Sequence, residues 1–340
     1  MKCTLKLVVF ATSLCLSIST NAGYLDCRSA YDKKEYGIAL TVCMPLANQG
    51  HAKAQNVIGL MYDTGHGVAQ NVKLALKWYR LSADQGYAIA QSNLGYMYAN
   101  GLGVSKDDKV AMTWYRLAAD QGDTESQNEI GVIYASGRGV TQDYREAMKW
   151  FRRAENKGNA SAQFNLGVMY ERGQGVTLDY KEAVKWYQLA ADQGFAKAQF
   201  SLGVLYANGQ GIPKNYKEAA RWYRLAADKG NVIAQFNLGN MYDKGQGVAK
   251  DYQEAVKWYR LAAEQGNAAA QNNLGVHYLQ GWGVPQSQSL AVTWYRKAAA
   301  QGNAISQKNL NDIADNNAID AINAVVNIFD ALLDYDDDYY

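Results

Sequence analysis

Residues 160–195 read ASAQFNLGVMYERGQGVTLDYKEAVKWYQLAADQGF, and similar stretches of the same length precede and follow them. A tryptophan recurs in these stretches at a constant spacing of 36 residues, at Trp78, Trp114, Trp150, Trp186, Trp222, Trp258 and Trp294. Seven units of 36 residues therefore cover residues 52–303. A fixed period of this length is typical of stacked helical units that share one continuous core.

Each unit divides into two amphipathic helices. Apolar residues of the first helix recur at i, i+4 and i+8, as in Ala162, Leu166 and Tyr170. Those of the second recur at i, i+3, i+4 and i+7, as in Ala183, Trp186, Tyr187 and Ala190. Gly173 ends the first helix, and Gly175 follows in a short loop. A glycine inside the first helix, Gly167, predicts close approach of the partner helix.

Polar residues predict where the helices begin. Asn159, Asn231 and Asn267 precede first helices and are expected to cap them. Second helices begin with Asp or Asn and carry Glu three residues later, a capping-box pattern seen at Asp143, Asp179, Asn215 and Asp251. The last unit lacks this pattern at residues 286–289, so no cap is expected there.

These features together predict an all-α fold of stacked antiparallel helix pairs. A single pair cannot bury both of its apolar faces, so the pairs must stack, and we expect a right-handed α-solenoid superhelix with a concave groove. The column of tryptophans is expected to lie in its core. A column of arginines that follows the aromatic pair is interpreted as a solvated rim, with recognition of acidic partners as the alternative: Arg80, Arg116, Arg152, Arg224, Arg260 and Arg296.

The combination AxAQxxLGxxY, GxGV and AxxWYxxAAxQG closely resembles the Sel-one-like repeat family, which is related to tetratricopeptide repeats. The resemblance covers about three quarters of the chain, 252 of 340 residues. It implies an adaptor, an assembly scaffold or a regulator, acting in secretory-pathway quality control or in the bacterial envelope. A cysteine-rich branch of the family has been linked to β-lactam binding or hydrolysis, but the seven units here contain no cysteine.

The resemblance also suggests a binding surface. In tetratricopeptide arrays, positions 2, 5, 9 and 12 of the first helix face the groove. Three successive units carry phenylalanine at position 5, and we call these the position-5 phenylalanines: Phe164, Phe200 and Phe236. Position 9 of the same units holds Val168, Val204 and Asn240. We expect these six residues to bind a peptide or protein partner. The alternative is that the phenylalanines pack between adjacent first helices.

The chain ends predict export. Lys2 and Lys6, the apolar run 7–16 and the small residues 20–22 resemble a cleaved signal peptide at 1–22, which leaves no integral membrane segment; a membrane anchor and a lipoprotein signal through Cys15 are the alternatives. We therefore expect a periplasmic or secreted protein. In an oxidising compartment the two cysteines that remain should form a disulfide: Cys27 and Cys43.

The residues outside the seven units are expected to close the array. Residues 23–51 resemble an N-terminal capping half-repeat, and residues 304–333 are predicted to form C-terminal capping helices. The final residues 334–340 are predicted to be an acidic, disordered tail.

Composition argues against several functions. A formal net charge of +2 gives no basic footprint for nucleic acid. The three histidines are scattered, and no HExxH or CxxC occurs, so we predict no catalytic residues, no metal site and no cofactor. The leading hypothesis is a protein-interaction scaffold of the bacterial envelope, with its oligomeric state open. The alternatives are a β-lactam-interacting hydrolase, a small-ligand receptor of the envelope, or a secreted host-contact factor.

Overall fold

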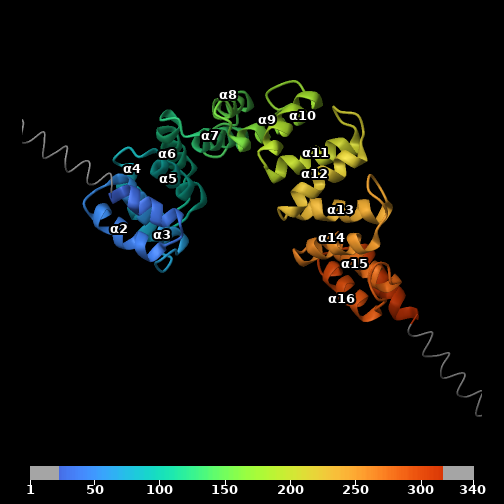
Figure 1. Cartoon of the computed structure of the whole chain (residues 1–340). Helices are drawn as coiled ribbons and strands as arrows, with labels where there is room; N and C mark the ends of the chain where they lie inside the picture. Colours follow the sequence, from blue (N-terminus) through green and yellow to red (C-terminus); the bar gives the residue numbers. More distant parts are fainter. Residues whose placement is uncertain (1–22, 317–340) are drawn as a thin grey trace, which may run out of the picture. The chain divides into compact units, whose positions relative to one another are not determined.

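The computed structural model describes residues 23–316, which form helices joined by short loops and contain no strand (Figure 1). Three predicted segments lie outside the described residues: the signal peptide 1–22, the end of the capping segment 317–333 and the tail 334–340. Within residues 23–316, no helix combines the length and apolar character that crossing a bilayer requires.

The chain divides into two compact units, one that ends at Asp179 and one that begins at Tyr180. The first unit contains α2 to α9 and the second contains α10 to α16. Inside each unit, every helix packs against its neighbours in sequence, as can be followed along the labels of Figure 1.

The helices alternate as the repeat predicts. After α2 (Tyr36–Asn48), the first helices are α3 (Ala52–Thr64), α5 (Ala88–Asn100), α7 (Thr124–Ser136), α9 (Ala160–Arg172), α11 (Ala196–Asn208), α13 (Val232–Lys244) and α15 (Ala268–Gln280). The second helices are α4 (Val72–Ala83), α6 (Asp108–Asp120), α8 (Tyr144–Glu155), α10 (Tyr180–Asp192), α12 (Tyr216–Asp228), α14 (Tyr252–Glu264) and α16 (Gln288–Ala299). Two further stretches, 23–32 and 304–316, are mainly helical. The predicted all-α fold of paired helices is confirmed.

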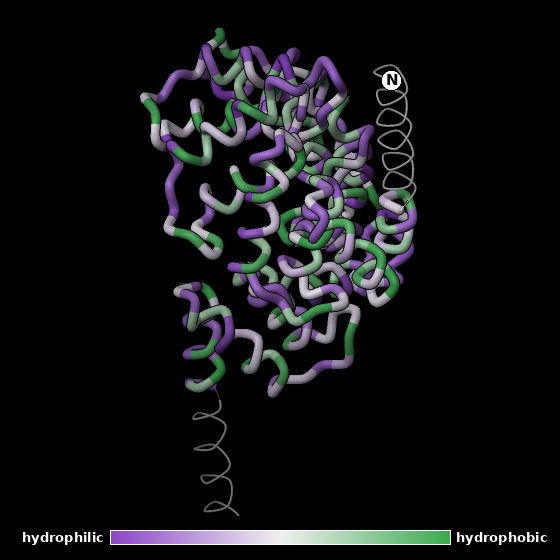
Figure 2. The backbone as a smooth tube through the Cα atoms, turned by 90° about the vertical axis from the view of Figure 1, so that its left-hand side faces the viewer, coloured by the Kyte–Doolittle hydropathy of each residue, from purple (hydrophilic) through white to green (hydrophobic). Residues whose placement is uncertain are grey.

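Hydrophobic and hydrophilic residues alternate along the helices (Figure 2). Within each compact part, buried apolar residues of successive repeats form shared clusters. Trp114 of α6, for example, packs against a cluster contributed by α4 of the preceding repeat and α5 of its own, including Tyr79 and Leu94. Trp78, Trp150 and Trp294 pack against such clusters in the same way. Trp222 and Trp258 are buried and the other five tryptophans are partly buried, so the expected place of the column in the core is confirmed in part.

The glycine inside each first helix makes room for a ring of the second helix. A Cβ on Gly95 would lie 2.6 Å from ring carbons of Tyr115, and a Cβ on Gly239 would lie equally close to Tyr259. Real Cβ atoms do not approach other atoms this closely, so the aromatic ring explains why a helix keeps glycine despite its low helix propensity. The predicted close approach is confirmed, and it involves a side chain of the partner helix.

The capping predictions are confirmed in part. Asn159, Asn231 and Asn267 accept hydrogen bonds from backbone amides three residues ahead. The capping box of the second helices is only half formed. Asp143 accepts from the Glu146 amide, but its own N–H donates to the Tyr134 carbonyl at 3.0 Å, which ties the helix start to the preceding helix.

One capping prediction is wrong. The last unit was expected to lack a cap at residues 286–289, but Ser287 accepts a hydrogen bond from the Leu290 amide at 3.3 Å. A serine hydroxyl can satisfy an amide at a helix start as an aspartate does, and the pattern of Asp followed by Glu does not include it.

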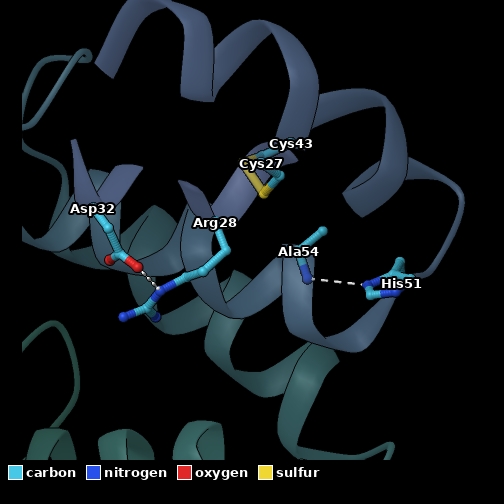
Figure 3. Close-up of a disulfide and its surroundings, with 6 residues drawn as sticks. All are labelled: Cys27, Arg28, Asp32, Cys43, His51 and Ala54. Atoms are coloured by element: carbon cyan, nitrogen blue, oxygen red, sulfur yellow. Dashed lines mark hydrogen bonds and ion pairs between the residues drawn. A yellow bond between two sulfur atoms is a disulfide. The ribbon is translucent and has the colours of Figure 1, made fainter. Parts of the chain in front are cut away.

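A disulfide joins Cys27 and Cys43, as expected, at a sequence separation of 16 positions (Figure 3). It connects the stretch 23–32 to α2, and both half-cystines are buried. Nearby, His51 accepts from the Ala54 amide and so caps α3. The start of the described chain is therefore anchored covalently to the array.

Candidate functional site

Two cavities open between successive first helices. One lies in the compact part that ends at Asp179, and the other lies in the part that begins at Tyr180. The first, of about 340 Å³, lies between α7 and α9, and Val132 and Val168 line it from position 9 of their repeats. The second, of about 280 Å³, lies between α13 and α15, and Asn240 and Val276 line it from the same position. The cavities are equivalent places in the repeat, so position 9 marks a recurring concavity beside the first helices.

The predicted binding residues occupy two different settings. Val168 lines the first cavity and Asn240 the second. The position-5 phenylalanines line neither cavity and are half-buried. The ring of Phe200 lies 5.9 Å from that of Tyr223, and Val204 packs against the same cluster. Phe236 lies 6.1 Å from Tyr259 in the same way.

The polar residues at position 5 of other repeats show what this position contacts. Asn56 and Asn128 are buried, and their Oδ1 atoms accept hydrogen bonds from Asn93 (3.0 Å) and Asn165 (2.8 Å) of the next first helix. Position 5 therefore lies at the joint between adjacent first helices. The structure gives the phenylalanines a packing role there, and their contact with a partner stays a prediction.

The linings of the two cavities differ in chemistry. The first combines Val132, Phe151 and Met169 with the exposed guanidinium of Arg172. The second combines the carboxylate of Asp243 and the exposed ammonium of Lys244 with amide, imidazole and indole groups. Equivalent positions thus present a largely apolar surface with an arginine in one repeat and a more polar surface with both a carboxylate and an ammonium group in another.

His277 sits at the centre of the second lining. It is buried on α15, its Nδ1 lies 3.0 Å from the carbonyl oxygen of Trp282, and its Nε2 lies 3.4 Å from Asp243 Oδ1 on α13. The Trp282 side chain is 40% exposed and stacks on Tyr252 with ring centroids 5.3 Å apart. An exposed indole and a carboxylate therefore face one small cavity.

Tyrosine and asparagine fix the polar side of this cavity. The Tyr259 hydroxyl donates to Asn240 Oδ1 at 2.7 Å, and Asn273 Nδ2 donates to the same oxygen at 3.2 Å. Burial, with a smaller contribution from the Asp243 carboxylate, raises the pKa of Tyr259 above its usual range. The hydroxyl thus remains a neutral donor near physiological pH and holds Asn240 in place.

Buried glutamines keep the repeats around the cavities in register. Gln91, at position 4, donates from Nε2 to the carbonyl of Ala83 in the preceding repeat at 3.3 Å. Gln121, at position 34, donates to Gln91 Oε1 at 2.8 Å. The same pair of bonds recurs in later repeats, at Gln235 with Gln265 and at Gln271 with Gln301. This network accounts for two glutamines that the repeat pattern retains.

The arginine column has a structural role that the sequence did not reveal. Arg116 donates to the Tyr134 hydroxyl of the next repeat at 2.6 Å, and Arg260 donates to that of Tyr278 at 2.9 Å. These side chains are exposed, as expected of a solvated rim, but they also link neighbouring repeats. Recognition of an acidic partner is not needed to explain them.

Sequence reasoning missed the three residues that distinguish the second cavity, Asp243, His277 and Trp282. A signal was present, because position 10 is apolar in the other six repeats: Met61, Met97, Ile133, Met169, Leu205 and Met241. A histidine at such a position departs from the pattern at a buried site. What the pattern did not indicate is that the imidazole meets a carboxylate of the preceding repeat.

These features define the class of protein: an α-solenoid built from helical-hairpin repeats. Seven consecutive segments match the Sel1 repeat, at residues 52–87, 88–123, 124–159, 160–195, 196–231, 232–267 and 268–303. The chain belongs to the Sel1 repeat family, whose solenoids are typically protein-interaction scaffolds. The expected resemblance is confirmed.

Solved structures of similar chains support the assignment. A protective antigen present in uropathogenic Escherichia coli strains, which displays an SLR fold, is 39% identical with a TM-score of 0.70. The alignment covers 80% of this chain and 58% of that one, so this chain spans little more than half of that protein. A Sel1 repeat protein from Oxalobacter formigenes is 36% identical with a TM-score of 0.65, and the alignment covers 71% of this chain and 96% of that one. Comparison with curated proteins gave no match.

Proposed function

We propose that this protein is an interaction scaffold of the bacterial envelope that binds a protein or peptide along its first helices. The observation that carries the proposal is the recurring cavity at position 9, whose lining changes from Val132 and Val168 in one place to Asn240 and Val276 in another. The residues that join the repeats are retained around it. A constant framework with a variable lining suits recognition of an extended partner.

The position-5 phenylalanines and their position-9 neighbours are the proposed contact residues. Each phenylalanine is half-buried at a joint between first helices, so part of its ring is open to a partner that lies against that joint. Val168 would contact a partner from the first cavity, and Asn240 would contact one from the second. Apolar side chains beside small cavities favour an extended or helical peptide as the bound form.

The Cys27–Cys43 disulfide supports a place outside the cytoplasm, since such bonds persist in oxidising compartments. The signal-like sequence at 1–22 and the bacterial sources of the two similar structures support an exported envelope protein. Periplasmic and secreted destinations are both consistent with the disulfide. Fractionation of a bacterial culture that expresses the chain would distinguish them.

A matched pair of variants tests the binding surface. Replacing the position-5 phenylalanines with asparagine introduces the residue that other repeats carry there, so the fold should persist. The control replaces three exposed leucines of the second helices in the same repeats, Leu189, Leu225 and Leu261, also with asparagine. We expect the phenylalanine variant to lose a protein captured from envelope extract, identified by mass spectrometry, and the leucine variant to retain it.

Circular dichroism checks that both variants keep their helices. If the phenylalanine variant still captures the same protein as the unmodified chain, these residues are not the contact surface. Loss of capture in both variants would show that the loss is not specific to the position-5 phenylalanines, and it would contradict their assignment as the contact surface.

The second candidate function is β-lactam binding or hydrolysis. A chromogenic β-lactam assay on the purified protein tests it directly. We expect no turnover. Turnover that a single substitution in either cavity abolishes would overturn the scaffold proposal.

A further inference from the structure

The hydrogen bonds of His277 fix where its ring protons lie. A carbonyl oxygen only accepts, so Nδ1, 3.0 Å from the Trp282 oxygen, must carry a hydrogen. In the neutral imidazole, Nε2 is then a bare acceptor. It lies 3.4 Å from the carboxylate oxygen of Asp243, which is also an acceptor. Two acceptors therefore lie next to each other at the wall of the second cavity, and a donor that reaches both of them would satisfy them.

The donor could be a second proton on the ring or a cationic group from outside. Two observations favour the cationic group. The Asp243 side chain is 25% exposed, and within residues 23–316 no lysine or arginine lies within ion-pair distance of it, although Lys250 interacts with it electrostatically at longer range. The cavity beside it has a volume of about 280 Å³, which is large enough for a side chain of another molecule. A carboxylate in this setting attracts a positive charge from solution.

The other walls suit the stem and the head of a long basic side chain. Val276 and the exposed Trp282 indole line the cavity and can cover an apolar stem. An aromatic ring also attracts a cation that lies against it. Lys244 lines the cavity as well, but its side chain is exposed, so its repulsion of a bound cation is screened by water.

The geometry points to a binding site for an arginine side chain of the partner, seated between α13 and α15. This inference rests on the proposed scaffold function and names one anchor of the bound protein. The guanidinium donates to Asp243 and to His277 Nε2 together, which a flat, multi-donor group does better than an ammonium. The equivalent cavity between α7 and α9 carries Met169 where His277 stands and has no carboxylate in its lining, so it does not share the site.

The test uses small probes and so does not depend on knowing the partner. N-acetyl-arginine amide is titrated into the purified protein, and the indole N–H signal of Trp282 is followed by NMR after assignment with Trp282→Phe. N-acetyl-citrulline amide is the neutral probe of the same shape. We expect a saturable shift with the arginine probe and none with the citrulline probe. Equal shifts with both, or no saturable shift with arginine, would overturn the inference.

Three variants sharpen the result. Asp243→Asn should weaken arginine binding by about tenfold or more, because it removes a charge-assisted pair. Lys244→Gln should strengthen it, since a like charge leaves the rim. Asp63→Asn is the matched control: Asp63 occupies the same repeat position in the first unit, where it accepts from the Tyr79 hydroxyl. It should leave arginine binding unchanged. Unaltered affinity in Asp243→Asn would reject the site.

The outcomes separate this inference from the scaffold proposal. If arginine fails to bind while the phenylalanine variant loses its captured protein, the cavity is not an anchor and the scaffold stands. If arginine binds as expected but that variant still captures its protein, the anchor stands and the position-5 contact surface is wrong.

Discussion

Replacing Lys157 with glutamine should stabilise this protein, because the lysine stands where other repeats donate a hydrogen bond to a buried glutamine. Lys157 is at position 34 of its repeat, as Gln121 is in the preceding one. Its Nζ donates instead to the Gly122 carbonyl at 3.0 Å. Oε1 of Gln127 is consequently buried and has no hydrogen-bond partner among the described residues.

The compact part that begins at Tyr180 contains a second buried glutamine oxygen without a donor. Lys229 donates to the Gly194 carbonyl, and Oε1 of Gln199 is buried without a partner in the described part of the chain. A buried acceptor without a donor costs about 1–3 kcal/mol, and the exposed lysine bond that is lost contributes less. We therefore expect each replacement by glutamine to raise the free energy of unfolding by about 1 kcal/mol. The two effects should add, since the sites lie in separate units.

Urea unfolding followed by far-UV circular dichroism measures the effect. Both variants should have a higher midpoint and an unchanged slope, because the surface exposed on unfolding stays the same. Gln121→Lys is the reverse control and should lower stability by a similar amount, as it would leave Gln91 Oε1 without its donor. If neither lysine replacement raises the midpoint and the reverse change has no effect, the glutamine network does not contribute to stability.

Three further predictions concern stability. Gly95→Ala should lower the free energy of unfolding in urea by about 1–3 kcal/mol, because the added Cβ would lie 2.6 Å from ring carbons of Tyr115. Glu129→Gln should raise it near neutral pH by on the order of 1 kcal/mol, because burial raises the pKa of this carboxyl and opposes its charge. Reduction of the Cys27–Cys43 disulfide should remove about 3 kcal/mol and lower the thermal midpoint.

Each of these has a control. The pKa of Glu129 is higher in the folded state than in the unfolded state, so the folded state favours the protonated carboxyl. The protonated carboxyl therefore does not oppose folding at low pH, and stability is lost as the pH rises through the folded pKa and the carboxyl becomes charged. The advantage of glutamine should vanish below about pH 4, and a difference that is independent of pH would contradict the assignment. Gly37→Ala should not destabilise, because a Cβ there meets nothing within 4 Å. A double serine variant at Cys27 and Cys43 should not respond to reductant, and an equal response would trace the loss to another cause.

Much of the fold was predictable because the same apolar spacing and the same helix-end residues recur in each repeat. The period of 36 fixed the unit, the apolar spacing fixed two helices, and Asn159 or Gly173 marked where a helix begins or ends. The glycine inside the first helix indicated a close neighbour, although only the structure identifies it as a ring such as Tyr115. Local patterns that recur seven times leave little room for another fold class.

The candidate site was less predictable, because its chemistry arises between repeats. His277 meets Asp243 across 34 positions of sequence, and the orientation of its ring depends on a backbone carbonyl in the following loop. The position-5 phenylalanines were expected from a family geometry that treats position 5 as exposed. In this chain Asn56 and Asn128 show that the position also holds adjacent first helices together. A departure from the repeat at a buried position is the more informative signal.

The bonds that join the repeats have a consequence for how this chain can change its length. Gln91 donates to Ala83 of the preceding repeat, and Arg116 donates to Tyr134 of the next one, so each of these bonds joins a repeat to its immediate neighbour. Removing or duplicating one whole block of 36 residues would bring equivalent positions together again, and the glutamine at position 4, which all seven repeats carry, could donate across the new junction as Gln91 does. Such a deletion or duplication would also move a cavity with a distinctive lining by one repeat along the array. Unequal recombination could therefore reposition binding groups in this protein without the need to evolve a new interior.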